Sequence, residues 1–284
     1  MKIQDVAKMS PQKRFLYWIK ERESIRLKKE AGEPKPWTDD PILQMYRFCN
    51  VRRMDDKVSQ WLLRYWYEPH FDHPNMLMAC SLARFINLPE SLEELGFPTR
   101  WNPARIVKVL SARRDRGCNV FNAAYIVSTN GVTGNKIDIV VNSHLAPLLS
   151  LRTSVCKSTT MQEAWKTLVG SKGLGSFMAG QIVADLRWAV SCEWSDRLTW
   201  APMGPGSKRG LNRLLGKDKN TPIKQLEFEA ELAKVIDLCH SIMPAICDRL
   251  EAIDYQNCLC EFDKYERTLH GEGRPKRNYD GGGS

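Results

Sequence analysis

The chain has 284 residues, of which 43% are hydrophobic, and it carries a formal net charge of +9. This length suffices for one large domain or two smaller ones, each with a real core, and the composition excludes a disordered chain. The basic charge favours an acidic partner such as nucleic acid, although a solvated charged surface gives the same balance. No apolar run approaches the roughly 18 residues of a membrane span, and we expect no signal peptide.

Nine cysteines are scattered without Cys-x-x-Cys spacing, and Cys258-x-Cys260 is too tight for a usual zinc knuckle. The pattern predicts reduced thiols in a cytoplasmic protein. His70-Phe-Asp-His73 could bind a metal, but prolines flank it and the sequence suggests no third ligand. A surface loop is therefore favoured there, and no metal site is predicted.

Helical periodicity dominates the chain from its first residues onward. Ser10-Pro11 suits a helix N-cap followed by the first helical position, and residues 137–141 fit either a strand or a helix start. The pattern predicts a mainly α fold with at most one short β-hairpin. Helices are expected at 10–31, 41–68, 74–88, 103–116, 118–127, 138–150, 160–170, 176–191, 207–215 and 224–252.

Three parts are expected along the chain. Residues 1–39 form an N-terminal basic helical extension, which ends in the helix-breaking sequence Gly32-Glu-Pro-Lys-Pro36. Residues 40–280 form a helical catalytic domain, as one body or as two lobes with a cleft between them. Residues 281–284 are a tail or a linker remnant.

Basic residues gather on the helix expected at 103–116. Six basic side chains between residues 100 and 117 face a single acid, Asp115. Such a basic face suits the phosphate backbone of DNA, and Arg105, Lys108 and Arg113 are its candidate contacts.

Gly173-Leu-Gly175 separates two helical patterns. Glycines let the backbone turn and approach a ligand, and the N–H groups that open a helix attract anions. The arrangement matches a helix-hairpin-helix, in which turn amides hold a DNA phosphate, often through a bound monovalent cation. An ordinary helical hairpin with a glycine C-cap fits equally well. Gly173, Gly175 and Ser176 are the candidate DNA contacts.

Two aspartates follow this turn. In helix-hairpin-helix DNA glycosylases the catalytic Asp follows that turn at a similar spacing to the one found here, where Asp196 lies 21 residues past Gly175 (196 minus 175). Asp196 is therefore a candidate general base or electrostatic stabiliser, unless it belongs to a solvated turn. Asp185 is the second candidate, although a carboxylate so close to core positions could equally be structural.

The sequence Gly204-Pro-Gly-Ser-Lys-Arg-Gly210 leads into another helix. It lacks the residue order of a nucleotide P-loop. It combines permissive backbone, a hydroxyl, two cations and a helix start, which suits phosphate or pyrophosphate. A plain loop before a capped helix is the alternative. The candidate pyrophosphate ligands are Gly204, Gly206, Ser207, Lys208 and Arg209.

Two further blocks mix cations with polar and aromatic side chains. Arg47 to Asp55 is expected to be helical, so that Asn50 and Arg53 share a face, though internal ion pairs explain it as well. Cys260 to Arg267 combines acids, cations and aromatics. A clamp for an amino-acid carboxylate or a phosphate is expected from Asn50, Arg52, Arg53, Lys264 and Tyr265.

Taken in order, these blocks resemble the phage family first called α-glutamyl/putrescinyl-thymine pyrophosphorylases and now described as amino acid:DNA transferases. That family shares its helical domain with 5-hydroxymethyluracil DNA kinases. The resemblance covers about residues 40–278. It rests on the segments Arg47–Asp55, Gly96–Asn102, Ala123–Ile126 with Asn130-Gly131, Gly173–Asp185, Trp200–Asn212 and Cys260–Arg267.

The resemblance implies a DNA-glycosylase-like helical fold with altered chemistry. The substrate would be double-stranded phage DNA whose 5-hydroxymethyluracil has been pyrophosphorylated by a kinase, and a small amine would displace the pyrophosphate. No cofactor is expected beyond the monovalent cation at the hairpin turn. The kinase is an expected partner, and the cytoplasm of the infected bacterium is the expected location. The missing P-loop favours a stand-alone transferase.

Within this scheme the target base is flipped out of the duplex. The loop at residues 204–209 stabilises the departing pyrophosphate, and Asp196 accepts a proton from the amine. Either Arg52 or Arg53 holds the pyrophosphate or an amino-acid carboxylate through two hydrogen bonds. Two alternatives stay open, namely a base-excision glycosylase and a non-catalytic DNA-binding partner of the kinase. The sequence does not identify the amine.

Overall fold

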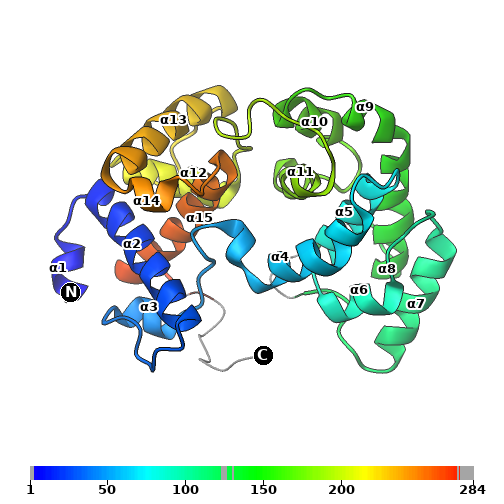
Figure 1. Cartoon of the computed structure of the whole chain (residues 1–284), viewed down its shortest axis with the longest axis horizontal. Coiled ribbons are helices and arrows are strands. Elements are labelled where there is room, and N and C mark those ends of the chain that lie inside the picture. The colour runs from blue at the N-terminus through cyan, green and yellow to red at the C-terminus, as the bar shows by residue number, and fades with distance from the viewer. Residues whose placement is uncertain (1–2, 123–126, 130, 274, 276–284) are drawn as a thin grey trace. The chain divides into compact units, whose positions relative to one another are not determined.

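The computed structural model describes residues 3–122, 127–129, 131–273 and 275, and these hold α-helices but no strand (Figure 1). The predicted mainly α fold is confirmed. The helices are α1 (Ile3–Ala7), α2 (Pro11–Glu30), α3 (Pro41–Met45), α4 (Lys57–Trp61), α5 (Met76–Ile86), α6 (Pro89–Leu95), α7 (Pro103–Asp115), α8 (Lys136–Asp138), α9 (Arg152–Cys156), α10 (Met161–Leu168), α11 (Ser176–Ala189), α12 (Pro205–Leu214), α13 (Gln225–Ile242), α14 (Pro244–Cys247) and α15 (Ala252–Leu269).

The chain divides into two compact units. Unit 1 comprises Met1–Asp56 and Met203–Ser284, and unit 2 comprises Lys57–Pro202. Helix α2 contacts α12 and α15, so the N-terminal segment packs as part of unit 1. The boundary expected between residues 39 and 40 coincides with neither end of unit 2.

Unit 1 is assembled around α15, which contacts α2, α3, α12 and α13. The long helix α2 starts as its sequence predicts, because Ser10 caps it and Pro11 occupies the first helical position. Phe15 of α2 meets Phe262 of α15 edge to face, with 5.2 Å between ring centroids. Both rings are fully buried, so this contact forms part of the core that fixes α2 on α15.

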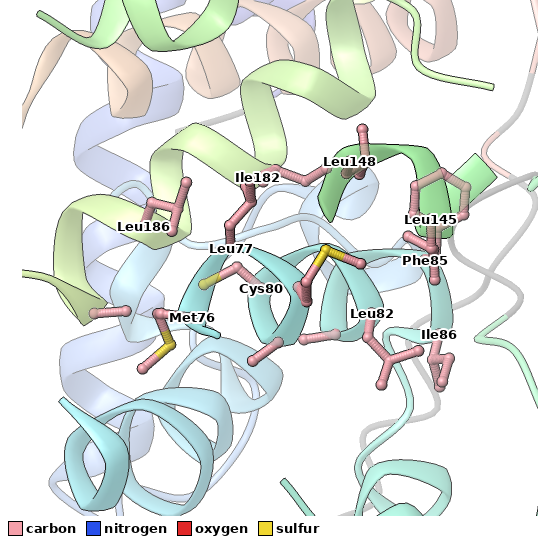
Figure 2. Packing of buried hydrophobic residues seen from close by; sticks show 14 of the residues in the cluster. Met76, Leu77, Cys80, Leu82, Phe85, Ile86, Leu145, Leu148, Ile182 and Leu186 are labelled. Carbon is pink, nitrogen blue, oxygen red and sulfur yellow. The ribbon is translucent and has the colours of Figure 1, made fainter. Parts of the chain in front are cut away.

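Unit 2 has α5 at its centre. All eleven residues of α5 are buried, so other elements surround this helix on every side. Figure 2 shows Met76, Leu77 and Cys80 of α5 packed near Ile182 and Leu186 of α11. Towards the other end, Phe85 lies near Leu145, which follows α8 in a π-helical turn, while Leu148 of the next 3₁₀ turn lies near Ile182.

Several segments differ from the sequence-based expectation. The helix expected over 41–68 is interrupted, because residues 47–50 are extended between α3 and a short 3₁₀ turn. Residues 118–122 are not helical, and 123–126 lie outside the described residues. Helix α15 was not predicted, because buried acids and aromatics obscure its apolar stripe. None of the described helices has the length and apolar character needed to cross a bilayer.

Candidate functional site

Four carboxylates of α15 are buried, and each of them binds a different part of unit 1. Glu266 receives two hydrogen bonds from Arg14 of α2, at 2.7 and 2.8 Å. Isolated buried charges are costly, so carboxylates in such positions are kept only when they are paired or hydrogen-bonded. The acids of the Cys260–Arg267 block therefore hold the fold together. The four are Asp254, Glu261, Asp263 and Glu266.

The extended segment after α3 satisfies its backbone with side chains instead of helical hydrogen bonds. Glu261 accepts the N–H of Cys49 at 2.9 Å, and Asp254 accepts the N–H of Arg53 at 2.7 Å. Because buried N–H groups need partners, these carboxylates on α15 stabilise the extended path. Asn50 and Arg53 consequently do not share a helix face, contrary to the expectation.

Arg22 of α2 also binds this segment through hydrogen bonds. Its guanidinium donates to the carbonyl oxygen of Cys49 at 3.0 Å and to Oδ1 of Asn50. The amide nitrogen of Asn50 in turn donates to the backbone oxygen of Asp55 at 2.6 Å. Asn50 thus shapes the loop, and both ends of its side chain are occupied by protein groups.

Asp56 is the last residue of this segment, and it is half-buried. Its Oδ1 accepts the backbone N–H of Asn50 at 2.9 Å. The pKa of Asp56 is raised to about 6, because burial and Glu261 raise it by more than the Asn50 hydrogen bond and Arg22 lower it. Sequence reasoning missed Asp56, and the only signal was its place beside Asp55 at the end of the Arg47–Asp55 block.

Helix α12 crosses α15 at very short range through two glycines. A Cβ on Gly206 would lie 2.3 Å from Sγ of Cys260, and one on Gly210 would lie 1.9 Å from the carbonyl oxygen of Leu259. Gly206 was expected to bind pyrophosphate. In the structure its Cα side lies against α15, as does that of Gly210 one helical turn later, so both glycines allow close helix packing.

Ser207 is also turned inward. It is fully buried, and its hydroxyl bonds the backbone N–H and carbonyl of Gly204 at 3.0 and 3.1 Å. Nε2 of Gln256 donates to the same hydroxyl at 3.1 Å. The hydroxyl expected to contact pyrophosphate therefore caps α12 and joins it to α15.

A cation cluster surrounds the buried carboxylate of Asp263. Nε of Arg209 and Nε of Arg213 donate to its two oxygens at 2.8 and 2.9 Å. Arg213 also holds Glu272, whose pKa the Arg213 and Lys219 side chains lower to about 2. The cluster has four cations for two acids, and it consists of Arg209, Arg213, Lys219 and Arg267 with Asp263 and Glu272.

Within this cluster Arg209 keeps its capacity to bind an anion. Its side chain is 34% exposed, and its terminal guanidinium nitrogens make no hydrogen bond to the residues that the structure describes. Lys208 precedes it in the first turn of α12 and is half-exposed. Free guanidinium N–H groups beside a helix N-terminus suit phosphate oxygens. Arg209 and Lys208 are thus the members of the 204–209 loop best placed for pyrophosphate.

The remaining clamp candidates differ in accessibility. Nζ of Lys264 donates to Glu261 at 2.9 Å and lies 4.5 Å from the centre of the Phe48 ring. Tyr265 is buried and donates to Asp40 at 2.6 Å, so it serves the core. The side chain of Arg52 is 27% exposed and 3.4 Å from Asp55, whereas Arg53 is buried.

Asp185 in unit 2 forms a buried ion pair. Arg84 of α5 approaches both carboxylate oxygens, and the hydroxyl of Tyr67 donates to Oδ2. Both charged side chains are almost completely buried, at 4% and 2% exposure. This geometry ties α11 to α5, which is the structural role that the sequence left open.

Asp196 is engaged with the start of another helix. Its two oxygens accept the backbone N–H groups of Met161 and Gln162 at 2.7 and 3.0 Å. These are among the first N–H groups of α10, which have no partner within the helix itself. Asp196 therefore acts as a cap for α10 from a distant part of the chain.

The glycine turn lies between α10 and α11. Gly173 has φ of +86° and packs against the buried ring of His144, where a Cβ would lie 2.2 Å from Cγ. Gly175 is exposed, with open space around its Cα, and it directly precedes α11. The carbonyl oxygen of Ser176 accepts a hydrogen bond from the indole N–H of Trp165. Gly173 fixes the turn and Gly175 leaves the start of α11 accessible.

The basic helix α7 is partly neutralised. Arg113 pairs with Glu94 and donates to the carbonyl of Asn119 at 2.7 Å, leaving its side chain 12% exposed. Arg105 is exposed but donates to the carbonyl of Leu95 at 2.7 Å, and Lys108 is exposed. Lys108 and Arg105 thus remain better candidates for DNA contact than Arg113.

The expected residues accordingly fall into two groups. Unit 1 contains the pyrophosphate and clamp candidates together with Asp56, while unit 2 contains both catalytic aspartates and the DNA-binding candidates. The segment Ala123–Ile126 with Asn130 lies outside the described residues. Among those that are described, no group of three or more His, Cys, Asp or Glu side chains could hold a metal ion.

Comparison with known proteins gives the family. The profile described as "5-hmdU DNA kinase, helical domain" matches residues 10–274. A protein named 5-hmdU DNA kinase, from Bacillus phage SP10, is 26% identical over 227 residues, which cover 69% of this chain and 35% of that relative. The chain thus spans about a third of the relative's length. No solved structure gives a significant match. This chain belongs to the family of 5-hmdU DNA kinase helical domains.

Proposed function

We propose that the chain transfers an amine onto DNA that contains pyrophosphorylated 5-hydroxymethyluracil. Membership of the 5-hmdU DNA kinase helical-domain family supports a role in modifying hydroxymethyluracil in phage DNA. The resemblance of the ordered motifs to amino acid:DNA transferases supports the specific reaction. In that reaction an amine displaces pyrophosphate from the methylene carbon attached to the base.

The observation that carries the transferase assignment is the cation cluster that α12 and the segment after it form around Asp263. Departing pyrophosphate is a highly charged leaving group, and prearranged cations stabilise such charge as it develops. Arg209 can donate its terminal N–H groups while its Nε remains on Asp263. Lys208, the residue before Arg209, adds a second cation, and the N-terminus of α12 lies about one turn before them.

Arg52 is the proposed holder of an amino-acid carboxylate. Its side chain is 27% exposed, whereas Arg53 is buried, so Arg52 is the better placed of the two to reach a small co-substrate. An Arg fork binds a carboxylate through two parallel hydrogen bonds. A polyamine would gain nothing from this residue, so an amino acid is the proposed class of amine.

DNA would be held by unit 2. Gly175 and Lys172 are exposed at the start of α11, and Lys108 and Arg105 are exposed on α7. Contacts of this kind neutralise phosphates and make affinity fall steeply with salt. A monovalent cation at the turn and flipping of the target base remain parts of this proposal.

The test uses duplex DNA bearing 5-pyrophosphoryloxymethyluracil with a mixture of amino acids and polyamines. Nucleosides from the digested product are then identified by mass spectrometry. An amine-adducted thymidine supports the proposal and names the nucleophile. Abasic sites would indicate a base-excision glycosylase, and unaltered DNA in a tight complex would indicate a binding module that serves a kinase.

A further inference from the structure

The carboxyl group of Asp56 has one occupied and one open oxygen. Oδ1 accepts the Asn50 N–H, whereas Oδ2 receives no hydrogen bond from the described residues. The residue is half-buried, and a donor that binds Oδ2 would replace no hydrogen bond of the described residues. Neither Asp185 nor Asp196 offers this, because protein groups hold both carboxylate oxygens in each of them.

Three charged side chains act on this carboxyl group. Arg22 comes from α2, Arg53 from the 3₁₀ turn before Asp56, and Glu261 from α15. Burial is the largest influence on the Asp56 pKa, Glu261 raises it as well and the two arginines lower it, and the net result is a pKa of about 6. A carboxylate of this kind is ionised at neutral pH and yet accepts a proton more readily than an ordinary Asp.

Asp56 is also electrostatically connected to the proposed pyrophosphate ligands. Glu261, Asp56 and Lys264 all act on the pKa of the buried Cys49 thiol, which burial raises. Burial likewise raises the pKa of Cys260 to about 12, and Lys264 and Arg209 oppose that rise. Hydrogen bonds join the same groups, because Glu261 accepts both the N–H of Cys49 and Nζ of Lys264. Asp56 holds the next N–H along the chain, that of Asn50, and Cys260 lies against Gly206 of α12, so Asp56 and α12 belong to one network of contacts in unit 1.

We propose that Asp56 is the proton acceptor for the incoming amine. This role rests on the proposed transferase function. The amine nitrogen forms a bond to the methylene carbon, and the carbon–oxygen bond to pyrophosphate breaks. Pyrophosphate leaves with the bonding electron pair, and one proton of the new ammonium group passes to Oδ2 of Asp56. Two different residues thus take the two products of bond formation: Asp56 receives the proton of the amine, and Arg209 binds the negatively charged pyrophosphate.

The test compares Asp56→Asn with the wild-type protein in amine transfer between about pH 5 and pH 8. Asparagine keeps an oxygen for the Asn50 N–H but cannot accept the proton. The expected result is a fall in kcat of at least about 100-fold with DNA affinity unchanged. The wild-type rate should rise with pH to a plateau above about pH 6, and this rise should be absent in the variant.

Asp56→Glu and Asp55→Asn are the matched variants. Asp56→Glu restores a carboxylate and should recover part of the rate. Asp55 pairs with Arg26, Arg52 and Arg249, so Asp55→Asn should lower stability while leaving the rise near pH 6 in place. If the wild type transfers amine and Asp56→Asn does so equally well, the role of Asp56 is overturned and the transferase function stands. If the wild type transfers no amine, the proposed function fails first.

Discussion

Gly210 of α12 lies against the backbone of Leu259 in α15 so closely that a Cβ would come within 1.9 Å of the Leu259 carbonyl oxygen. A backbone atom cannot swing away as a flexible side chain can, so the helices must separate to admit a methyl group. We expect Gly210→Ala to lower the free energy of unfolding by about 3 kcal/mol or more.

Urea denaturation measures this effect, and Gly175→Ala is the control. Gly175 has open space around its Cα and a negative φ, so its substitution should change stability by less than about 1 kcal/mol. Equal stability of Gly210→Ala and the wild type would show that α12 and α15 do not cross as described.

Arg209 and Arg213 share Asp263, but they should respond differently to truncation. Arg213 is 9% exposed and also holds Glu272, so Arg213→Ala should cost about 2–3 kcal/mol of stability. Arg209 is 34% exposed, and Arg213 still satisfies Asp263 in its absence, so Arg209→Ala should cost at most about 1 kcal/mol.

Binding of inorganic pyrophosphate separates the two arginines further. Arg209→Ala should weaken binding at least about 10-fold by isothermal titration calorimetry, because it removes charge-assisted hydrogen bonds. Pyrophosphate affinity equal to that of the wild type would remove Arg209 from the proposed site.

Asp196 should prove to be a structural residue. Replacement by alanine leaves two N–H groups of α10 without their acceptor, and the loss of a helix cap costs about 1 kcal/mol. We expect Asp196→Ala to unfold at a lower temperature and to keep its amine-transfer rate per folded molecule. Loss of turnover in a fully folded variant would restore Asp196 as the candidate base.

Sequence reasoning predicted most helices but assigned the wrong environment to several site residues. Ser10-Pro11 identified the start of α2 correctly because capping is local chemistry. Gly206 and Ser207 were predicted to bind an anion. In the structure they contact Cys260 and Gln256, which lie about fifty positions further along the chain. Such contacts depend on tertiary structure and leave no local pattern.

The same limit explains the residues that were missed. Arg22 acts on a loop in a distant part of the sequence, and Asp56 owes its raised pKa to burial and to Glu261 of α15. The helical reading of 47–55 failed because carboxylates of α15 accept the N–H groups of that segment. A single sequence does not show where those acceptors lie.

Stability should depend on pH through Asp56. Its pKa is raised from 3.8 to about 6 in the folded protein, so folding favours the protonated form. This contribution is complete below about pH 4 and is lost as the pH rises through about 6. Relative to Asp56→Asn, the wild type should therefore lose up to about 3 kcal/mol of stability between about pH 4 and pH 7.

Urea denaturation of both proteins at several pH values gives this difference directly. Parallel pH profiles for Asp56→Asn and the wild type would mean that the carboxyl group titrates as it does in an unfolded chain. The raised pKa of Asp56 would then be contradicted, together with the chemical reason for proposing it as a proton acceptor.

The central claim is tested most directly by counting products on DNA that carries 5-pyrophosphoryloxymethyluracil. Released pyrophosphate and amine incorporated into the base are measured in the same reaction, with Arg209→Ala as the control. The account predicts one pyrophosphate for each amine incorporated, no abasic sites, and little of either product with the variant. Abasic sites, or pyrophosphate release without incorporated amine, would contradict it.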